Sequence, residues 1–245
     1  MTPAYEPVRL VVHGASGRMG QALLRLRAEQ PALRLVAAVA GREAPRIEGV
    51  PGFTAAQLDA LPPFDVCIDF SLPQGFDAVL ACCRERGAAL VSGTTGLTPH
   101  QRVELDAAAT RIPVLWSANF SLGVAVLTDL VRRAAAALPQ WQRDIVESHH
   151  IHKQDAPSGT ALALGQAMQD GGGGAPHYAS LRAGDIVGEH LVQFTGLGER
   201  IELVHRATDR DIFARGALRC ALALAQRAPG RYRVIELLDQ TAAPR

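Results

Sequence analysis

Gly14-Ala15-Ser16-Gly17-Arg18-Met19-Gly20 is the stretch that decides the fold, because it joins a strand-like run directly to a helical one. Residues 8–12 before it are apolar apart from Arg9 and rich in valine, as in a buried strand, and residues 19–29 after it predict a helix. Glycines at this spacing let the backbone turn tightly and approach a pyrophosphate, whose charge the helix N-terminus then meets. The order of strand, loop and helix predicts a dinucleotide-binding loop, with a tight turn that binds nothing as the alternative.

The first 120 residues alternate short β-branched runs with helical stretches, a pattern typical of a parallel sheet covered on both faces. Further strands are expected over residues 33–39, 65–70, 88–92 and 113–117, with helices over residues 73–86 and from Pro99 onward. Five strands joined by helical crossovers predict a doubly wound α/β sheet.

The pattern changes after Asn119. The sequence predicts a helix over residues 123–138, a strand over 144–149, strands over 190–195 and 200–206, and a helix over 211–227 that returns to the first domain. The alternation of the two later strands predicts antiparallel pairing with one covered face, as is often found at an oligomer interface. Gly171 to Gly174 is expected to be a flexible surface loop.

Composition excludes several classes of function. The chain has 245 residues, 48% of them apolar, with 25 basic and 24 acidic side chains, so nothing predicts a nucleic-acid partner. No run approaches the roughly 18 apolar residues of a membrane helix, and residues 1–7 do not resemble a secretory signal. Four cysteines without a C-x-x-C pair are expected to be buried free thiols, and a cytoplasmic location follows as an expectation.

The end of the second predicted strand bears on which dinucleotide binds. The segment reads Val39-Ala40-Gly41-Arg42-Glu43, with no acid directly at the strand end. An acid there bonds the ribose hydroxyls of NADH, whereas an arginine accommodates the 2′-phosphate of NADPH. Arg42 therefore favours NADPH, while Glu43 keeps NADH open and a solvated loop charge remains the alternative for Arg42.

Two more loops follow strand ends, where open α/β sheets bind their ligands. They are Phe70-Ser71-Leu72 and Gly93-Thr94-Thr95-Gly96. Their small and hydroxylated residues permit close approach of the backbone, and we expect both loops to face the nicotinamide half of a cofactor. The same residue types also suit ordinary turns.

The stretch from Glu147 to Ala161, ESHHIHKQDAPSGTA, concentrates titratable groups before a helix start. Ser158 is expected to cap that helix, so that the amides of Gly159 and Thr160 point at an incoming carboxylate. Lys153 can supply charge or a proton to the same ligand, and His149 can donate a proton near neutral pH. No metal is expected, because the histidines have no acidic or cysteine partner at a familiar spacing.

This stretch resembles the signature E-x-H-H-x-x-K-x-D-A-P-S-G-T-A of the 4-hydroxy-tetrahydrodipicolinate reductase (dihydrodipicolinate reductase) family. Other family segments occur in order over essentially the whole chain: the glycine loop, Asp69-Phe70-Ser71, Gly93-Thr94-Thr95-Gly96, Ala118-Asn119-Phe120-Ser121 and residues 182–190. The chain departs from the family at Gly171 to Gly174, where many relatives have a longer loop that contains arginine.

The resemblance implies an enzyme that transfers a hydride from NADPH or NADH to a cyclic unsaturated amino dicarboxylate in lysine and diaminopimelate biosynthesis. It also implies a homotetramer of chains with a Rossmann-like cofactor domain over residues 1–120, completed by residues 210–245. Residues 121–209 would form an α+β domain for substrate binding and tetramerisation.

The resemblance further implies roles for single residues. His149 would be the proton donor or acceptor and Lys153 a second donor, with His150, Gly159 and Thr160 as contacts to the substrate carboxylates. The residues implied at the cofactor are Ala118, Asn119, Phe120, Arg210 and Phe213.

Two rival functions share the predicted cofactor fold. A semialdehyde dehydrogenase that forms a thioester needs a catalytic cysteine, and none of the four cysteines lies in a glycine-rich or histidine-containing loop. A dinucleotide sensor without catalysis needs no proton donors beside an anion-binding helix start. The stretch from His149 to Thr160 therefore favours a reductase.

Overall fold

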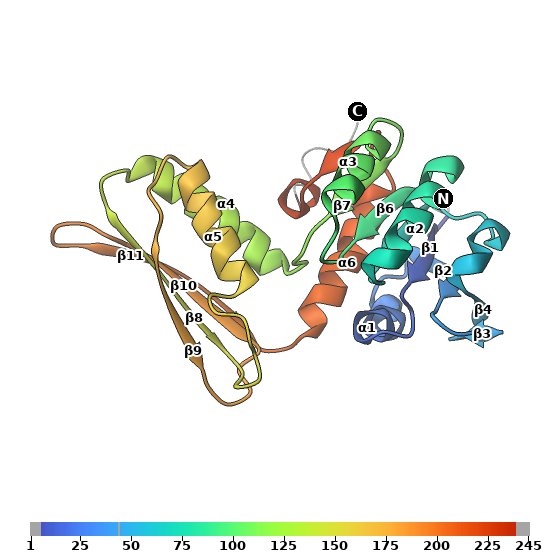
Figure 1. Ribbon diagram of the computed structural model, residues 1–245, viewed down its shortest axis with the longest axis horizontal. Helices are drawn as coiled ribbons and strands as arrows, with labels where there is room; N and C mark the ends of the chain where they lie inside the picture. Colours follow the sequence, from blue (N-terminus) through green and yellow to red (C-terminus); the bar gives the residue numbers. More distant parts are fainter. Residues whose placement is uncertain (1–5, 44, 239–245) are drawn as a thin grey trace, which may run out of the picture. The chain divides into compact units, whose positions relative to one another are not determined.

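The computed structural model describes residues 6–43 and 45–238. The chain divides into two compact units, of which the first runs to Phe120 and resumes at Phe213, while the second spans Ser121–Ile212. Figure 1 shows the sheet of each unit with its helices. Within the described ranges, no helix is both long enough and apolar enough to cross a membrane.

The first unit is built on one large sheet. Its strands are β1 (Val8–His13), β2 (Leu33–Val39), β3 (Arg46–Ile47), β4 (Val50–Phe53), β5 (Val66–Asp69), β6 (Ala89–Ser92), β7 (Pro113–Trp116) and β12 (Gly230–Tyr232). Their order is β12-β7-β6-β5-β1-β2-β4-β3, and every neighbouring pair is parallel except β3 with β4. The predicted doubly wound α/β sheet is confirmed.

The helices of this unit begin and end at residues that favour helix ends. They are α1 (Arg18–Leu26), α2 (Pro73–Arg86), α3 (Pro99–Ala108) and α6 (Asp211–Leu224), whose first two residues belong to the second unit, with short 3₁₀ turns at Arg27–Glu29, Ala55–Ala60 and Val234–Leu237. Pro73 stands in the first turn of α2, and Gly87 ends that helix in the left-handed region. Thr98 and Gln101 form a capping box at the start of α3.

The order of the strands creates a switch point beside β1. The chain passes from β1 to β2 on one side and then places β5 on the other side of β1. The two connections leave in opposite directions, and the carboxyl ends of strands at such a point are where open α/β sheets bind their ligands. The glycine loop follows β1 and Phe70 follows β5, so both predicted cofactor segments lie at this edge.

The second unit has a four-stranded sheet covered on one face by two helices. Its strands are β8 (Gln142–His149), β9 (His177–Arg182), β10 (Gly188–Thr195) and β11 (Arg200–Ala207), in the order β11-β10-β8-β9. The helices α4 (Leu122–Ala137) and α5 (Gly159–Asp170) pack on it through a core that includes Val131, Leu164 and Phe194 (Figure 1). The predicted antiparallel pairing of β10 with β11 is confirmed.

Gly171 to Gly174 differs from the expected flexible loop, because its first glycines close the end of α5. The amides of Gly171, Gly172 and Gly173 donate to carbonyls of the last helical turn, at 3.1, 2.9 and 3.0 Å. A Cβ on Gly171 would lie 2.3 Å from the carbonyl oxygen of Arg132 in α4, so only glycine allows this approach. The segment is a hydrogen-bonded helix end at the surface.

Candidate functional site

The glycine loop has the geometry that a pyrophosphate requires. Gly14 has a φ of +81°, and a Cβ there would lie 2.4 Å from the carbonyl oxygen of Phe70. Gly20 is packed as tightly, since its Cβ would lie 2.2 Å from the Gly14 oxygen. Gly17 is the N-cap of α1, no side chain caps this helix, and its first turn has no acidic residue. These uncapped amides at the switch point fit the phosphates of a dinucleotide.

The end of β2 is hydrogen-bonded to the glycine loop. The amides of Gly14 and Ala15 both donate to the Val39 carbonyl, at 3.0 and 2.9 Å. Arg42 comes three residues after Val39 in an exposed turn. The loop residues Ser16 and Arg18 are exposed as well.

A buried carboxylate at the end of β5 joins three strand ends, a role that no sequence pattern indicated. Asp69 Oδ1 accepts from His13 Nδ1 at 2.8 Å and from the Ser71 amide at 3.1 Å. Its Oδ2 accepts from the hydroxyls of Ser92 and Thr94, at 2.8 and 2.7 Å. Burial raises the pKa of Asp69, but the hydrogen bonds outweigh burial and the pKa is lowered. Asp69 thereby fixes both predicted nicotinamide loops.

An aromatic contact brings together three of the predicted cofactor segments. The Phe70 ring meets that of Phe120 edge-on, with centroids 5.5 Å apart. A Cβ on Gly93 would lie 2.1 Å from the Phe70 ring, so any side chain at this position would force that ring to move. Trp116 Nε1 donates to the Thr94 carbonyl at 2.8 Å, which holds the loop after β6 against β7. Ala118 and Asn119 follow β7 directly, and Thr95 is exposed.

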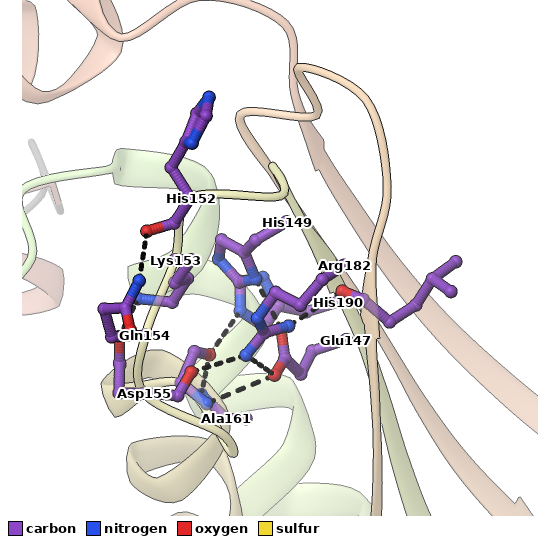
Figure 2. A network of polar contacts seen from close by, with 11 residues as sticks. Glu147, His149, His152, Lys153, Gln154, Asp155, Ala161, Arg182 and His190 are labelled. Carbon is purple, nitrogen blue, oxygen red and sulfur yellow. Dashed lines mark hydrogen bonds and ion pairs between the residues drawn. The ribbon is translucent and has the colours of Figure 1, made fainter.

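The end of β8 carries the predicted proton donor. His149 is 8% exposed, and its Nδ1 is hydrogen-bonded to the fully buried carboxylate of Glu147. Arg182 on β9 holds the same carboxylate with two nitrogens, at 3.0 and 2.8 Å (Figure 2). Burial lowers the pKa of His149, and the neighbouring Lys153 and Arg182 lower it further against the opposing effect of Glu147. Sequence reasoning missed Glu147 and Arg182.

Ser158 is the N-cap of α5, as predicted, and its Oγ accepts from the Ala161 amide at 3.1 Å. The same hydroxyl lies 3.3 Å from Nε2 of His190, a buried residue of β10 that was not among the predicted site residues. Burial and the neighbouring His149 and His205 lower the pKa of His190 to about 4. His190 is therefore neutral near pH 7 and can accept the Ser158 proton.

Lys153 forms an ion pair with a carboxylate of the protein itself, that of Asp155. Its Nζ lies 2.8 Å from Asp155 Oδ1 (Figure 2). Hydrogen bonds from Lys153 and from the backbone amides of Asp155 and Gly159 outweigh desolvation and lower the pKa of Asp155. The predicted anion-binding groups Lys153 and Gly159 thus meet on one carboxylate.

The remaining predicted residues are distributed over the two units. His150 follows β8, and burial together with the nearby charge of Arg210 lowers its pKa. Arg210 belongs to the second unit, whereas Phe213 belongs to α6 of the first. Thr160 lies in the first turn of α5, and His152 is exposed. Across the described residues, no cluster of three or more His, Cys, Asp or Glu side chains could hold a metal ion.

Comparisons with known proteins agree over both units. The family model "Dihydrodipicolinate reductase, N-terminus" matches residues 8–120, and "Dihydrodipicolinate reductase, C-terminus" matches residues 123–238. A 4-hydroxy-tetrahydrodipicolinate reductase of Stenotrophomonas maltophilia (strain K279a) is 68% identical over 236 residues, which cover 95% of this chain and 98% of the relative. One from Xanthomonas campestris pv. campestris (strain B100) is 63% identical over 95% of this chain and 98% of its own.

Solved structures share the fold at low identity. Dipicolinate-bound dihydrodipicolinate reductase from Paenisporosarcina sp. TG-14 superposes with a TM-score of 0.77 at 21% identity, covering 93% of this chain and 97% of that one. The DAP dehydrogenase of C. glutamicum, in complex with DAP, gives 0.62 at 16% identity over 96% of each chain. The matches to both family models and to close relatives show that the chain belongs to the dihydrodipicolinate reductase family, as an NAD(P)H-dependent 4-hydroxy-tetrahydrodipicolinate reductase.

Proposed function

We propose that the reduction is divided between two sets of residues. The glycine loop, Arg42 and the loops fixed by Asp69 bind the cofactor, while the N-terminus of α5, Lys153 and His150 bind the substrate carboxylates. Bound NAD(P)H supplies the hydride, and His149 supplies or removes the proton. Residues 1–120 with 210–245 would serve the cofactor, and residues 121–209 the substrate and assembly.

The carboxylate of Asp155 is the observation that carries the substrate assignment. This carboxylate occupies the position in which we expect a substrate carboxylate to bind. The Lys153 ammonium and the backbone amides of Asp155 and Gly159 hold it as they would hold a ligand. An incoming dicarboxylate that binds more favourably would take over Lys153 and the Gly159 amide. Asp155 is exposed, so its own carboxylate can return to solvent at little cost.

The cysteines support a reductase over the thioester-forming rival. All four cysteines are buried and free. Burial raises the pKa of Cys220 to about 12, and the pKa of Cys67 is raised by its contact with Cys83 and by burial. A nucleophilic cysteine needs an accessible thiolate, which these side chains do not provide.

Pyridine-2,6-dicarboxylate should compete with the substrate, because it presents two carboxylates on a planar ring and does not readily accept a hydride. We expect competitive inhibition at millimolar concentration or below when initial rates are measured against substrate. Isophthalate, which lacks the ring nitrogen, serves as a matched ligand for the carboxylates alone. A pyridine dicarboxylate that leaves the rate unchanged at millimolar levels would contradict the proposed substrate site.

Replacing Arg42 with Ala should weaken NADPH binding by about tenfold or more and leave NADH binding nearly unchanged, since only NADPH has a 2′-phosphate. Fluorescence titration with each reduced cofactor measures both affinities. Arg46→Ala is the matched control, because Arg46 is another exposed arginine close by in the chain. Equal losses for both cofactors would mean that Arg42 is a loop charge without a part in selection.

We also infer that the chain assembles as a homotetramer in the cytoplasm. The face of the β8–β11 sheet that the helices leave open carries an apolar row across all four strands: Val204, Leu191, Val146 and Ala179. Val146 and Val204 are 38% and 44% exposed, which supports burial of this row against other copies. Four free cysteines support a reducing compartment. A light-scattering mass of one chain would contradict the assembly.

A further inference from the structure

The strand β8 places a fully buried carboxylate beside the proposed proton donor. Glu147 and His149 are two residues apart, so they lie on the same face of the strand. Arg182 is the direct cross-strand neighbour of His149 on β9, and His190 is that of Glu147 on β10. Glu147 has no exposed surface. A charge in such a place is stable only when it is fully hydrogen-bonded.

The hydrogen bonds of Glu147 meet this condition. Oε2 contacts His149 Nδ1 and accepts from Arg182 Nη1 at 3.0 Å. Oε1 accepts from Arg182 Nη2 at 2.8 Å and from the Ser158 amide at 3.3 Å. Burial raises the pKa of Glu147, but hydrogen bonds from Arg182, Ser180 and His149 outweigh it and lower the pKa to about 2. The group is therefore a carboxylate near neutral pH.

An ionised carboxylate only accepts hydrogen bonds, so the proton between Glu147 and His149 belongs to Nδ1 of the imidazole. This fixes the tautomer and leaves Nε2 as the nitrogen that gains and loses a proton. Gly188 provides the room for it, because a Cβ at that position would lie 3.0 Å from His149 Nε2.

Arg182 connects this pair to the loop that carries Lys153. Its Nη2 also donates to the Asp155 carbonyl at 2.5 Å, and the Asp155 carboxylate is the one that holds Lys153. Figure 2 shows Arg182 between Glu147 and the Asp155 loop. One guanidinium thus sets the positions of the carboxylate and of the loop.

We propose that Glu147 and Arg182 are positioning residues for the reaction: Glu147 holds His149 in the Nδ1-protonated tautomer, and Arg182 fixes Glu147 and the loop of Lys153. The proposal rests on the proposed role of His149 as the proton donor or acceptor. Neither residue touches the reacting atoms, and both act through His149 and Lys153.

The two positioning residues have opposite electrostatic effects on His149. Glu147 favours the imidazolium, whereas Arg182 disfavours it, as does Lys153. His190, whose ring centroid lies 5.3 Å away, is neutral near pH 7 because its pKa is about 4. Removing the charge of Glu147 should therefore lower the pKa of His149, and removing that of Arg182 should raise it.

The test uses Glu147→Gln and Arg182→Met, which change charge with little change in size. We expect the pH at which His149 titrates to fall by about one unit or more in E147Q and to rise by a smaller amount in R182M. Nitrogen NMR of labelled histidine measures this titration and the tautomer without any turnover. In E147Q we also expect loss of the pure Nδ1–H tautomer and a turnover at least about tenfold lower at pH 7.

Controls separate this role from simple stabilisation. Glu189→Gln removes a carboxylate from the neighbouring strand, where Glu189 pairs with Arg206 at 3.4 Å, and should leave the His149 titration in place. Arg182→Lys keeps the charge and should have a higher turnover than Arg182→Met. Unfolding midpoints identify a variant that merely fails to fold.

The outcomes distinguish the two proposals. Shifts of both titrations in one direction, or an unchanged tautomer in E147Q, would overturn the positioning roles. If the NMR titrations shift in opposite directions while the pH dependence of turnover stays that of the parent, the positioning of His149 holds and its role in proton transfer fails.

Discussion

His149→Gln is expected to lower turnover by about 100-fold or more while the affinity for NADPH stays nearly unchanged. Glutamine keeps the polar contact with Glu147 but has no proton to exchange near neutral pH. The affinity for NADPH should stay the same because the glycine loop and Asp69 with its hydrogen-bond donors lie in the other unit. Steady-state kinetics and direct NADPH titration measure the two quantities separately.

His152→Gln is the matched control for this substitution. It makes the same chemical change three residues later, at an exposed histidine. We expect turnover within about twofold of the parent, as for most surface changes. If His149→Gln kept near-normal turnover, or lost NADPH binding instead, the proton-transfer assignment would have to be abandoned even though the family is established.

Lys153→Ala is expected to lower turnover and to raise the apparent KM for the dicarboxylate as well, since it removes both a charge and a possible proton. Lys153 is the only lysine of the chain, because the other 24 of its 25 basic residues are arginines. An ammonium can release a proton when its pKa is lowered, whereas a guanidinium stays charged, so the two side chains can be told apart at this position.

Lys153→Arg tests that difference directly. It keeps the positive charge for the carboxylate but has a pKa too high to release a proton. We expect a KM closer to that of the parent than in the Ala variant, with turnover still reduced. An arginine variant with full turnover would limit Lys153 to binding charge and exclude it as a proton donor.

Local sequence patterns were sufficient for most of the first unit. The strands β1, β2, β5, β6 and β7 were predicted because each is a mostly apolar run beside a helical one. The strands β3, β4 and β12 were not, because they have two to four residues and too little periodicity to recognise. They lie at the two edges of the sheet.

The second unit was harder to predict because its key contacts join distant strands. Strand β9 is six residues long, mostly exposed, and pairs in parallel with β8 after the α5 crossover. Its register, which no local pattern encodes, brings Arg182 to Glu147. The alternation of strand residues did place Glu147 and His149 on one face, and this signal could have identified the pair.

The buried Asp69 cluster escaped prediction for a similar reason. Each of its donors is an ordinary strand or loop residue in the sequence, and the four meet only when β1, β5 and β6 are side by side. The glycine loop could be recognised because all of its parts are contiguous. A site built from one continuous segment can be recognised in a sequence. A site built from several segments can be recognised only when the order of the strands in the sheet is known.

The two helices of the second unit begin at neighbouring points of the same sheet. Ser121 and Ser158 cap α4 and α5, and each hydroxyl lies 3.3 Å from a histidine of one cross-strand pair, His205 and His190. The positive ends of both helix dipoles therefore lie beside this histidine pair. A dianion approaching through water is attracted before it makes any contact, so the rate of encounter should depend on ionic strength more steeply than the rate of escape.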